Sequence, residues 1–148
     1  MPRSMEIPPR ARPASDDGYL EQMTKAIFQA GFSWPVVREK WPAFQRAFDG
    51  FSIPKVAAYD ELDVERLLAD EGIVRNARKI LATIENARIM QRLIAEHGSF
   101  YAYLRSLDGL TYEEKKRVLT RTFRHLGRTG CFVFLWCVDE EVPSWEER

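Results

Sequence analysis

From Asp16 onward the chain is a succession of helix-start signals, apolar residues spaced three and four positions apart, and glycines that end helices. Residues at that spacing lie on one face of an α-helix, so the pattern predicts amphipathic helices. No two neighbouring segments alternate apolar and polar residues as paired strands would. The chain has 148 residues, which suits one domain with one core. We therefore predict an all-α, single-domain bundle of about seven or eight helices over residues 16–148.

The individual helices follow from their caps and apolar faces. Asp16 begins a helix that ends at about Ala30, and residues 37–48 place Val37, Trp41, Phe44 and Phe48 on one face. Thr111 and Glu114 have the spacing of a capping box for a helix ending near Gly127. We also expect helices over 52–58, 60–70 and 99–107, and a long helix ending at Gly98 with Ala77, Ile80, Leu81, Ile84 and Ala87 on its buried face.

Two segments are less regular. Residues 1–15 hold four prolines and no aromatic residue, which predicts an extended and partly mobile arm. Cys131 to Val138 are apolar throughout, and periodicity alone does not separate a buried strand from a buried helix. Because no second strand is available for pairing, we interpret this run as a buried helix.

Composition excludes several classes of function. Basic and acidic residues are equal at 22 each, so no polybasic coat for nucleic acid or membrane exists and any basic patch is local. No apolar run approaches the roughly 20 residues of a membrane span, and the N-terminal residues lack the apolar core of a signal peptide. Two cysteines do not make a disulfide framework. We expect a cytoplasmic protein with no membrane partner.

Charge is nevertheless unevenly distributed. Residues 72–92 carry five bases and one acid. Gly72 precedes a helix start, with Arg75, Arg78 and Lys79 close by. Free N–H groups and the positive end of a helix dipole attract phosphate, and nearby cations strengthen the attraction. These are the interactions by which a helix-hairpin-helix motif binds the DNA backbone, without contacts to the base edges that carry the sequence. The alternatives are a solvated helix face and a Gly72 that only ends a helix.

Three stretches together resemble a known family. Gln29–Trp34 (QAGFSW), Phe44–Phe48 (FQRAF) and Asp63–Asn76 (DVERLLADEGIVRN) are similar to the DNA-3-methyladenine glycosylase type I family of base-excision repair enzymes. The resemblance covers residues 16–107 well and 112–138 more loosely. It implies an all-α helix-hairpin-helix glycosylase fold with a base pocket between two helical lobes, and double-stranded DNA as the partner, bound independently of sequence.

The resemblance also implies roles for individual residues. Trp34 matches the tryptophan that stacks on the base. Gln29 to Phe32 match the segment that invades the DNA strand, with Phe32 where a leucine wedge is usual. Gly72 to Lys79 match the hairpin that contacts the DNA backbone. A flipped base must leave its stack, and an indole face attracts a cationic alkylpurine by about 0.5–2 kcal/mol beyond stacking.

The chain differs from the family pattern at the residue that recognises the base and at the residues that bind the structural zinc. The family glutamate that recognises the methylated base corresponds to Ala26, so no catalytic residue is assigned. The family's structural zinc needs Cys and His near both termini, but residues 1–30 and those after Val138 contain neither. Cys131 and Cys137 fall within the apolar run, and we expect neither metal nor another cofactor.

Three hypotheses therefore stay open. The chain is a working glycosylase for cationic alkylpurines, or a catalytically degraded relative that binds DNA or senses lesions, or an interaction module that has left DNA. Release of a base from methylated DNA separates the first two, and salt-dependent DNA binding separates the last two.

Overall fold

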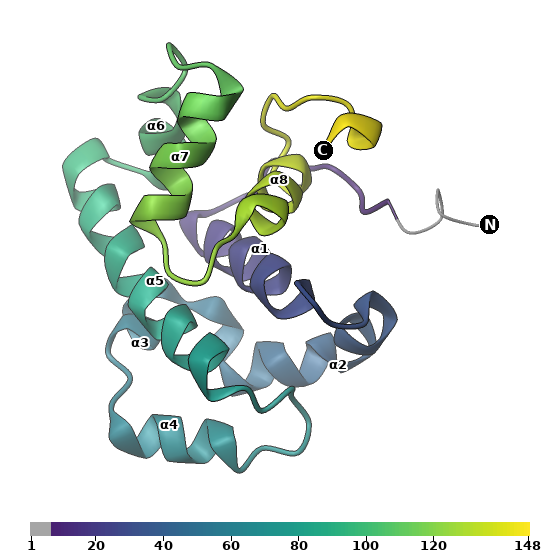
Figure 1. Ribbon diagram of the computed structural model, residues 1–148. Coiled ribbons are helices and arrows are strands. Elements are labelled where there is room, and N and C mark those ends of the chain that lie inside the picture. The colour runs from purple at the N-terminus through teal and green to yellow at the C-terminus, as the bar shows by residue number, and fades with distance from the viewer. Residues whose placement is uncertain (1–6) are drawn as a thin grey trace.

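The computed structural model describes residues 7–148 and contains only helices and loops in that range (Figure 1). The all-α prediction is confirmed. The elements are α1 (Asp16–Gln29), α2 (Trp34–Ala47), η2 (Asp49–Phe51), α3 (Ile53–Ala57), α4 (Glu61–Leu68), α5 (Ala77–His97), α6 (Phe100–Arg105), α7 (Tyr112–Thr122), α8 (Arg128–Cys137) and η3 (Trp145–Glu147).

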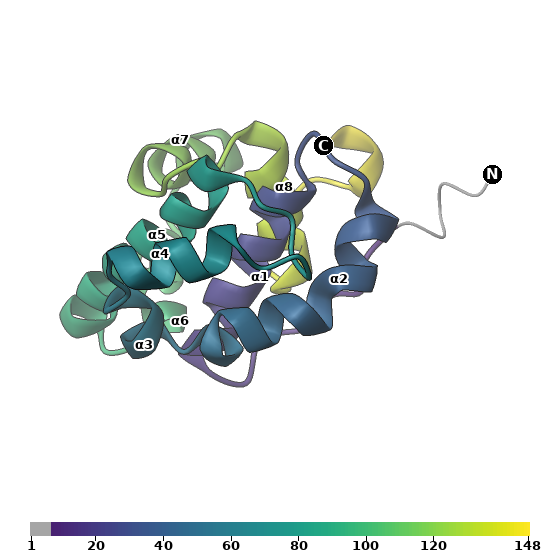
Figure 2. The same cartoon turned by 90° about the horizontal axis from the view of Figure 1, so that it is seen from below.

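Helix α1 lies at the centre of the bundle. It packs against α8 on one side and against α2 and α5 on the other, and the long α5 also contacts α3 and α6 (Figures 1 and 2). Helices α2 to α4 thus form one lobe and α6 to α8 the second, with α1 and α5 between them. This arrangement leaves the C-terminal end of α1 where the two lobes meet.

The expected apolar face of α2 is confirmed. Val37, Trp41, Phe44 and Phe48 are all buried. The aromatic side chains of this face also contact η2. The centroid of the Trp41 ring lies 5.3 Å from that of the Phe51 ring, with 6° between the ring planes. Aromatic pairs at such distances add about 0.5–1.5 kcal/mol to the hydrophobic contribution of burial, so this cluster fixes α2 against α1.

The predicted capping box of α7 is also present. The Thr111 side chain accepts a hydrogen bond from the Glu114 N–H at 3.1 Å, and Glu114 Oε1 accepts one from the Thr111 N–H at 2.9 Å. Helix α7 ends at Thr122 rather than near Gly127, because Phe123 is extended and the Asn86 side chain binds both backbone groups of Arg124.

The buried face of α5 differs from the prediction. Ala77 is exposed and Leu81 is 52% exposed, whereas Lys79, Thr83 and Asn86 are buried. Polar side chains tolerate burial when they are hydrogen-bonded, and the Thr83 hydroxyl donates to the Lys79 carbonyl at 2.8 Å. Helix α5 therefore turns a partly polar stripe toward the end of α1, where Lys79 binds, and toward the loop after α7, where Asn86 binds Arg124.

The apolar run near the C-terminus is helix α8, as predicted, and its residues Cys131 and Cys137 are buried free thiols. The described part of the N-terminal arm docks on this helix. Trp136 Nε1 donates to the Pro8 carbonyl at 2.9 Å, and Arg10 Nε donates to the Trp136 carbonyl at 2.8 Å. These contacts attach residues 8–10 to α8, whereas residues 1–6 of the predicted arm lie outside the described part of the chain.

Within residues 7–148, no helix is both long and apolar enough to cross a membrane.

Candidate active site

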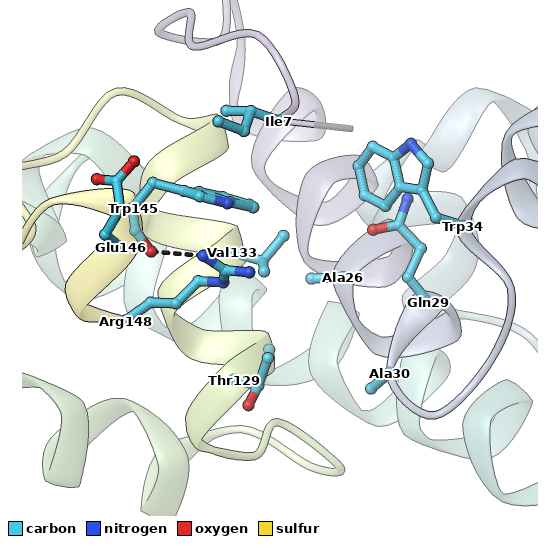
Figure 3. Close-up of a pocket in the computed structure, with 11 residues that line it drawn as sticks. Ile7, Ala26, Gln29, Ala30, Trp34, Thr129, Val133, Trp145, Glu146 and Arg148 are labelled. Atoms are coloured by element: carbon cyan, nitrogen blue, oxygen red, sulfur yellow. Dashed lines mark hydrogen bonds between the residues drawn. The ribbon is translucent and has the colours of Figure 1, made fainter. Parts of the chain in front are cut away.

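A cavity of about 600 Å³ opens where the lobes meet, beside the end of α1 (Figure 3). Helix α1 contributes Ala26 and Gln29 to its wall, and α8 contributes Thr129 and Val133 on the opposite side. The ends of the chain complete it, since Ile7 and the residues around η3 also line the cavity. The lining is mostly apolar with a few polar groups, which is the usual character of a small-molecule site.

Two tryptophans face each other across this cavity. Trp34 is the first residue of α2, where the preceding Ser33 side chain accepts a weak hydrogen bond from the Val36 N–H at 3.5 Å. Trp145 in η3 lies on the opposite side (Figure 3). Its ring is held by edge contact with Trp136, at 5.0 Å between ring centroids. The cavity therefore has an indole in its wall on each of two sides.

Trp34 carries a motif that predicts its place at the pocket, whereas no sequence signal predicts the place of Trp145. Trp145 follows the last apolar run in a short polar segment, where an isolated aromatic residue carries no periodic signal. The structure also places Arg148 here. Its guanidinium lies 4.2 Å from the Trp145 ring centroid, and Nη1 donates to the Trp145 carbonyl at 2.5 Å. Arg148 thus braces η3 and gives the cavity a positive group.

Gln29, which we predict to belong to the strand-invading segment, is the last residue of α1. Its side chain lines the cavity and its amide lies beside Trp34 (Figure 3). Its contact with DNA stays a prediction. Its Nε2 is buried and has no hydrogen-bond partner in the described structure.

Phe32 does lie on an exposed turn. Gly31 adopts a φ of 71°, a left-handed conformation that glycine reaches without strain. The chain reverses there, and Phe32 follows with 48% of its surface exposed. Phe32 lies on the turn between Ala30 and Trp34, two residues that line the cavity, and its role as a wedge stays a prediction.

The predicted hairpin is the loop between α4 and α5. Gly72 does not cap α4, which ends at Leu68 with Ala69 as its C-cap. Gly72 is required by close packing instead, because a Cβ there would lie 2.9 Å from the Cβ of Ala43. Its N–H donates to Asp70 Oδ1 at 2.8 Å, so this group is already used within the loop. Arg75 and Arg78 are both exposed on the loop and the first turn of α5.

Lys79 differs from the expectation of an outward cation. The residue is only 8% exposed, and its Nζ donates to the Ala30 carbonyl at 2.9 Å and to the Phe28 carbonyl at 3.4 Å. Burial lowers the pKa of its ammonium group. A cation at the negative C-terminal end of α1 is electrostatically favourable. Lys79 thus joins the hairpin to the end of α1, and its predicted contact with DNA phosphate stays a prediction.

Comparison with known proteins decides the family. The profile described as Methyladenine glycosylase matches residues 11–125. The DNA-3-methyladenine glycosylase 1 of Escherichia coli (strain K12) is 32% identical over 126 residues, covering 72% of this chain and 67% of that protein. The chain belongs to the methyladenine glycosylase family. The resemblance drawn from the sequence is therefore confirmed.

Further relatives agree. The DNA-3-methyladenine glycosylase of Haemophilus influenzae (strain ATCC 51907 / DSM 11121 / KW20 / Rd) is 27% identical over 126 residues, covering 72% of this chain and 68% of that protein. A crystal structure of 3-methyladenine DNA glycosylase I superimposes with a TM-score of 0.73 at 26% identity, covering 86% of this chain and 81% of the other. The Staphylococcus aureus enzyme has a TM-score of 0.76 at 22% identity, covering 86% and 78%, which supports the fold.

The cavity of this methyladenine glycosylase family member has no carboxylate at residue 26. Ala26, at the position where the resemblance implies a glutamate, is 3% exposed and presents a methyl group to the cavity. The nearest carboxylate in the lining, that of Glu146, points away from the cavity in Figure 3. The structural zinc that the resemblance implies does not fit either, because residues 7–148 contain no cluster of three or more potential ligands.

Proposed function

We propose that this protein is a base-excision repair glycosylase that removes cationic alkylpurines, such as 3-methyladenine, from duplex DNA. The cavity between Trp34 and Trp145 carries the proposal, because its lining is mostly apolar and aromatic side chains flank it, and the exposed wedge candidate lies on the turn between Gln29 and Trp34. Flipping a base out of the stack costs a few kcal/mol, and stacking in such a pocket offsets that cost.

Excision of a cationic alkylpurine requires little catalysis from the protein. An alkylated purine with positive charge is already a good leaving group, so departure needs little acid catalysis. Stacking on an indole adds a cation–π attraction of about 0.5–2 kcal/mol. Neutral bases such as uracil would have to leave as anions, and nothing in the lining supplies a proton donor with that role, so we expect no release of uracil or hypoxanthine.

DNA contact is assigned to the exposed groups around the cavity. Phe32 would fill the space that the flipped base vacates, while Arg75 and Arg78 would contact phosphates. Because these contacts touch no base edges, binding should be independent of sequence and should weaken steeply with salt.

Single-turnover release of 3-methyladenine from methylated duplex DNA tests the proposal. We expect slow release by the parent, loss of release by Trp34→Ala, and partial retention by Trp34→Phe, which keeps an aromatic face. The Arg75→Ala/Arg78→Ala double variant should bind duplex DNA more weakly and lower the salt slope by about two.

A second candidate is favoured by Ala26 and Arg148. The missing carboxylate and the cation at the cavity both oppose a positively charged base, and both suit a protein that binds DNA lesions without excising them. Salt-dependent binding to methylated duplex with no base released, even by Ala26→Glu, would support this reading. Absence of salt-dependent DNA binding would instead favour an interaction module without a DNA partner.

A further inference from the structure

Trp136 on α8 contacts two segments that come from opposite ends of the chain. Its indole Nε1 donates to the Pro8 carbonyl at 2.9 Å, and its ring makes an edge contact with that of Trp145 at 5.0 Å between centroids. Pro8 follows Ile7 directly, and both Ile7 and Trp145 line the cavity (Figure 3). One side chain therefore contacts both terminal segments that complete the cavity wall.

The C-terminal segment reaches the cavity through side-chain packing. In the described structure, every hydrogen bond of residues 144–148 lies within that segment, and η3 contains no buried residue. The Trp145 ring packs on α8, against Trp136 and, at 5.7 Å between centroids, against Phe132. The position of Trp145 in the cavity wall therefore depends on ring contacts rather than on hydrogen bonds.

The N-terminal arm is attached to α8 by backbone and side chain together. The Ala11 N–H donates to the Cys137 carbonyl at 3.1 Å, and Arg10 Nε donates to the Trp136 carbonyl at 2.8 Å. These acceptors belong to the backbone of α8, so they remain when the Trp136 side chain is replaced. The bond from Trp136 Nε1 to the Pro8 carbonyl is the one closest in sequence to Ile7, so it fixes the arm where the arm meets the cavity.

We propose that Trp136 is a positioning residue, which holds Ile7 and Trp145 in the cavity wall without lining the cavity itself. This role rests on the proposed function. The two contacts use different parts of the indole, since the N–H binds the arm and the ring binds Trp145. Trp136→Phe keeps a ring for Trp145 but removes the N–H, whereas Trp136→Leu removes both.

Trypsin cleavage after Arg10 measures the attachment of the arm, because cleavage follows the population of the segment that has left the surface. Loss of one neutral hydrogen bond corresponds to about 2- to 13-fold in that population. We expect Trp136→Phe to release the fragment that begins at Ala11 faster than the parent by this factor. Trp136→Leu should be cleaved faster still, because it also loses the contact between the ring and the Arg10 guanidinium, which lies 4.4 Å from the ring centroid.

Single-turnover release of 3-methyladenine from methylated duplex DNA measures the effect on excision. Loss of an aromatic pair corresponds to about 2- to 13-fold, so Trp136→Leu should release the base at least about 3-fold more slowly than the parent. Trp136→Phe should lie between the two, because it keeps the ring. Both variants should bind the duplex as tightly as the parent, since Arg75 and Arg78 are unchanged. A general loss of folded protein would lower rate and affinity together.

Trp41 provides the matched control. Its Nε1 also makes one hydrogen bond, to Glu21 Oε2 at 2.8 Å, and its ring also packs on aromatic neighbours, but it lies on α2 and does not line the cavity. Trp41→Phe should lower the thermal midpoint at least as much as Trp136→Phe does. Its cleavage after Arg10 and its rate of base release should equal those of the parent.

The outcomes separate the two proposals. If Trp136→Phe is cleaved after Arg10 as slowly as the parent, or if Trp136→Leu releases the base as fast as the parent, the positioning role is wrong, even though excision persists. If both variants are cleaved faster while the parent releases no base from methylated DNA, the attachment of the arm by Trp136 stands and the proposed excision is wrong.

Discussion

Replacing Lys79 with methionine should lower stability and leave the salt dependence of DNA binding intact. The ammonium group is buried and donates to the Ala30 carbonyl at 2.9 Å, with a weaker contact to the Phe28 carbonyl at 3.4 Å. A hydrogen bond from a charged donor contributes about 1.5–3 kcal/mol. Burial of the charge, which lowers the Lys79 pKa, offsets part of this contribution.

Methionine keeps an unbranched apolar stem, so packing is largely retained. We expect a net loss of about 1–2 kcal/mol, which lowers the thermal midpoint by about 2–8 °C in a chain of this size. Thermal unfolding followed by circular dichroism at pH 7 measures this shift, and fluorescence anisotropy at several salt concentrations measures DNA affinity.

Arg78→Met is the matched control, because Arg78 is the preceding residue and is exposed. It should change stability by less than about 0.5 kcal/mol and reduce the slope of log K against log salt by about one. The reverse pattern, with Lys79→Met at the parent's midpoint but a reduced slope, would show that Lys79 contacts phosphate and that its inward bonds are dispensable.

The remaining predictions concern the thiols and the hairpin. Burial raises the pKa of Cys131 to about 12 and that of Cys137 to about 11, so both should resist a disulfide reagent at pH 8 until urea unfolds the chain; fast labelling of the native protein would contradict their burial. The unfolded thiols ionise near pH 9, whereas the folded thiols stay protonated at that pH. The free energy of unfolding should therefore fall as pH rises above 9. Gly72→Ala would place a Cβ 2.9 Å from that of Ala43 and should cost about 1–3 kcal/mol, which Ala43→Gly should restore; unchanged denaturant midpoints would show that the loop yields freely.

Local signals made most of the fold predictable. The face of α2 and the capping box of α7 depend on residues within one or two helical turns, so spacing alone identifies them. The α5 face was partly wrong because burial there depends on long-range hydrogen bonds. Asn86 is buried since it binds the backbone of Arg124, 38 positions away, and no local pattern reports such a partner.

The candidate site shows the same division. Trp34 lies in a motif that the sequence carries intact. Lys79 sits in a basic segment after a glycine, which predicts phosphate contact, yet its partners are backbone carbonyls 49 and 51 positions earlier. Every residue has a carbonyl, so this kind of partner leaves no trace in the side-chain sequence. Trp145 reaches the cavity only through the path of the C-terminal segment.

The cavity, the wedge candidate Phe32 and the hairpin are directly connected to one another. Gln29 ends α1, and Trp34 begins α2 after a short turn that carries Phe32. Lys79 holds the Ala30 carbonyl, so the first turn of α5 is attached to that same turn. A force on Phe32 or on the hairpin therefore acts on residues 29–34. This segment begins with Gln29 and ends with Trp34, and both residues line the cavity. Under the proposed function, the wedge candidate and the aromatic wall of the cavity are therefore joined through a few consecutive residues.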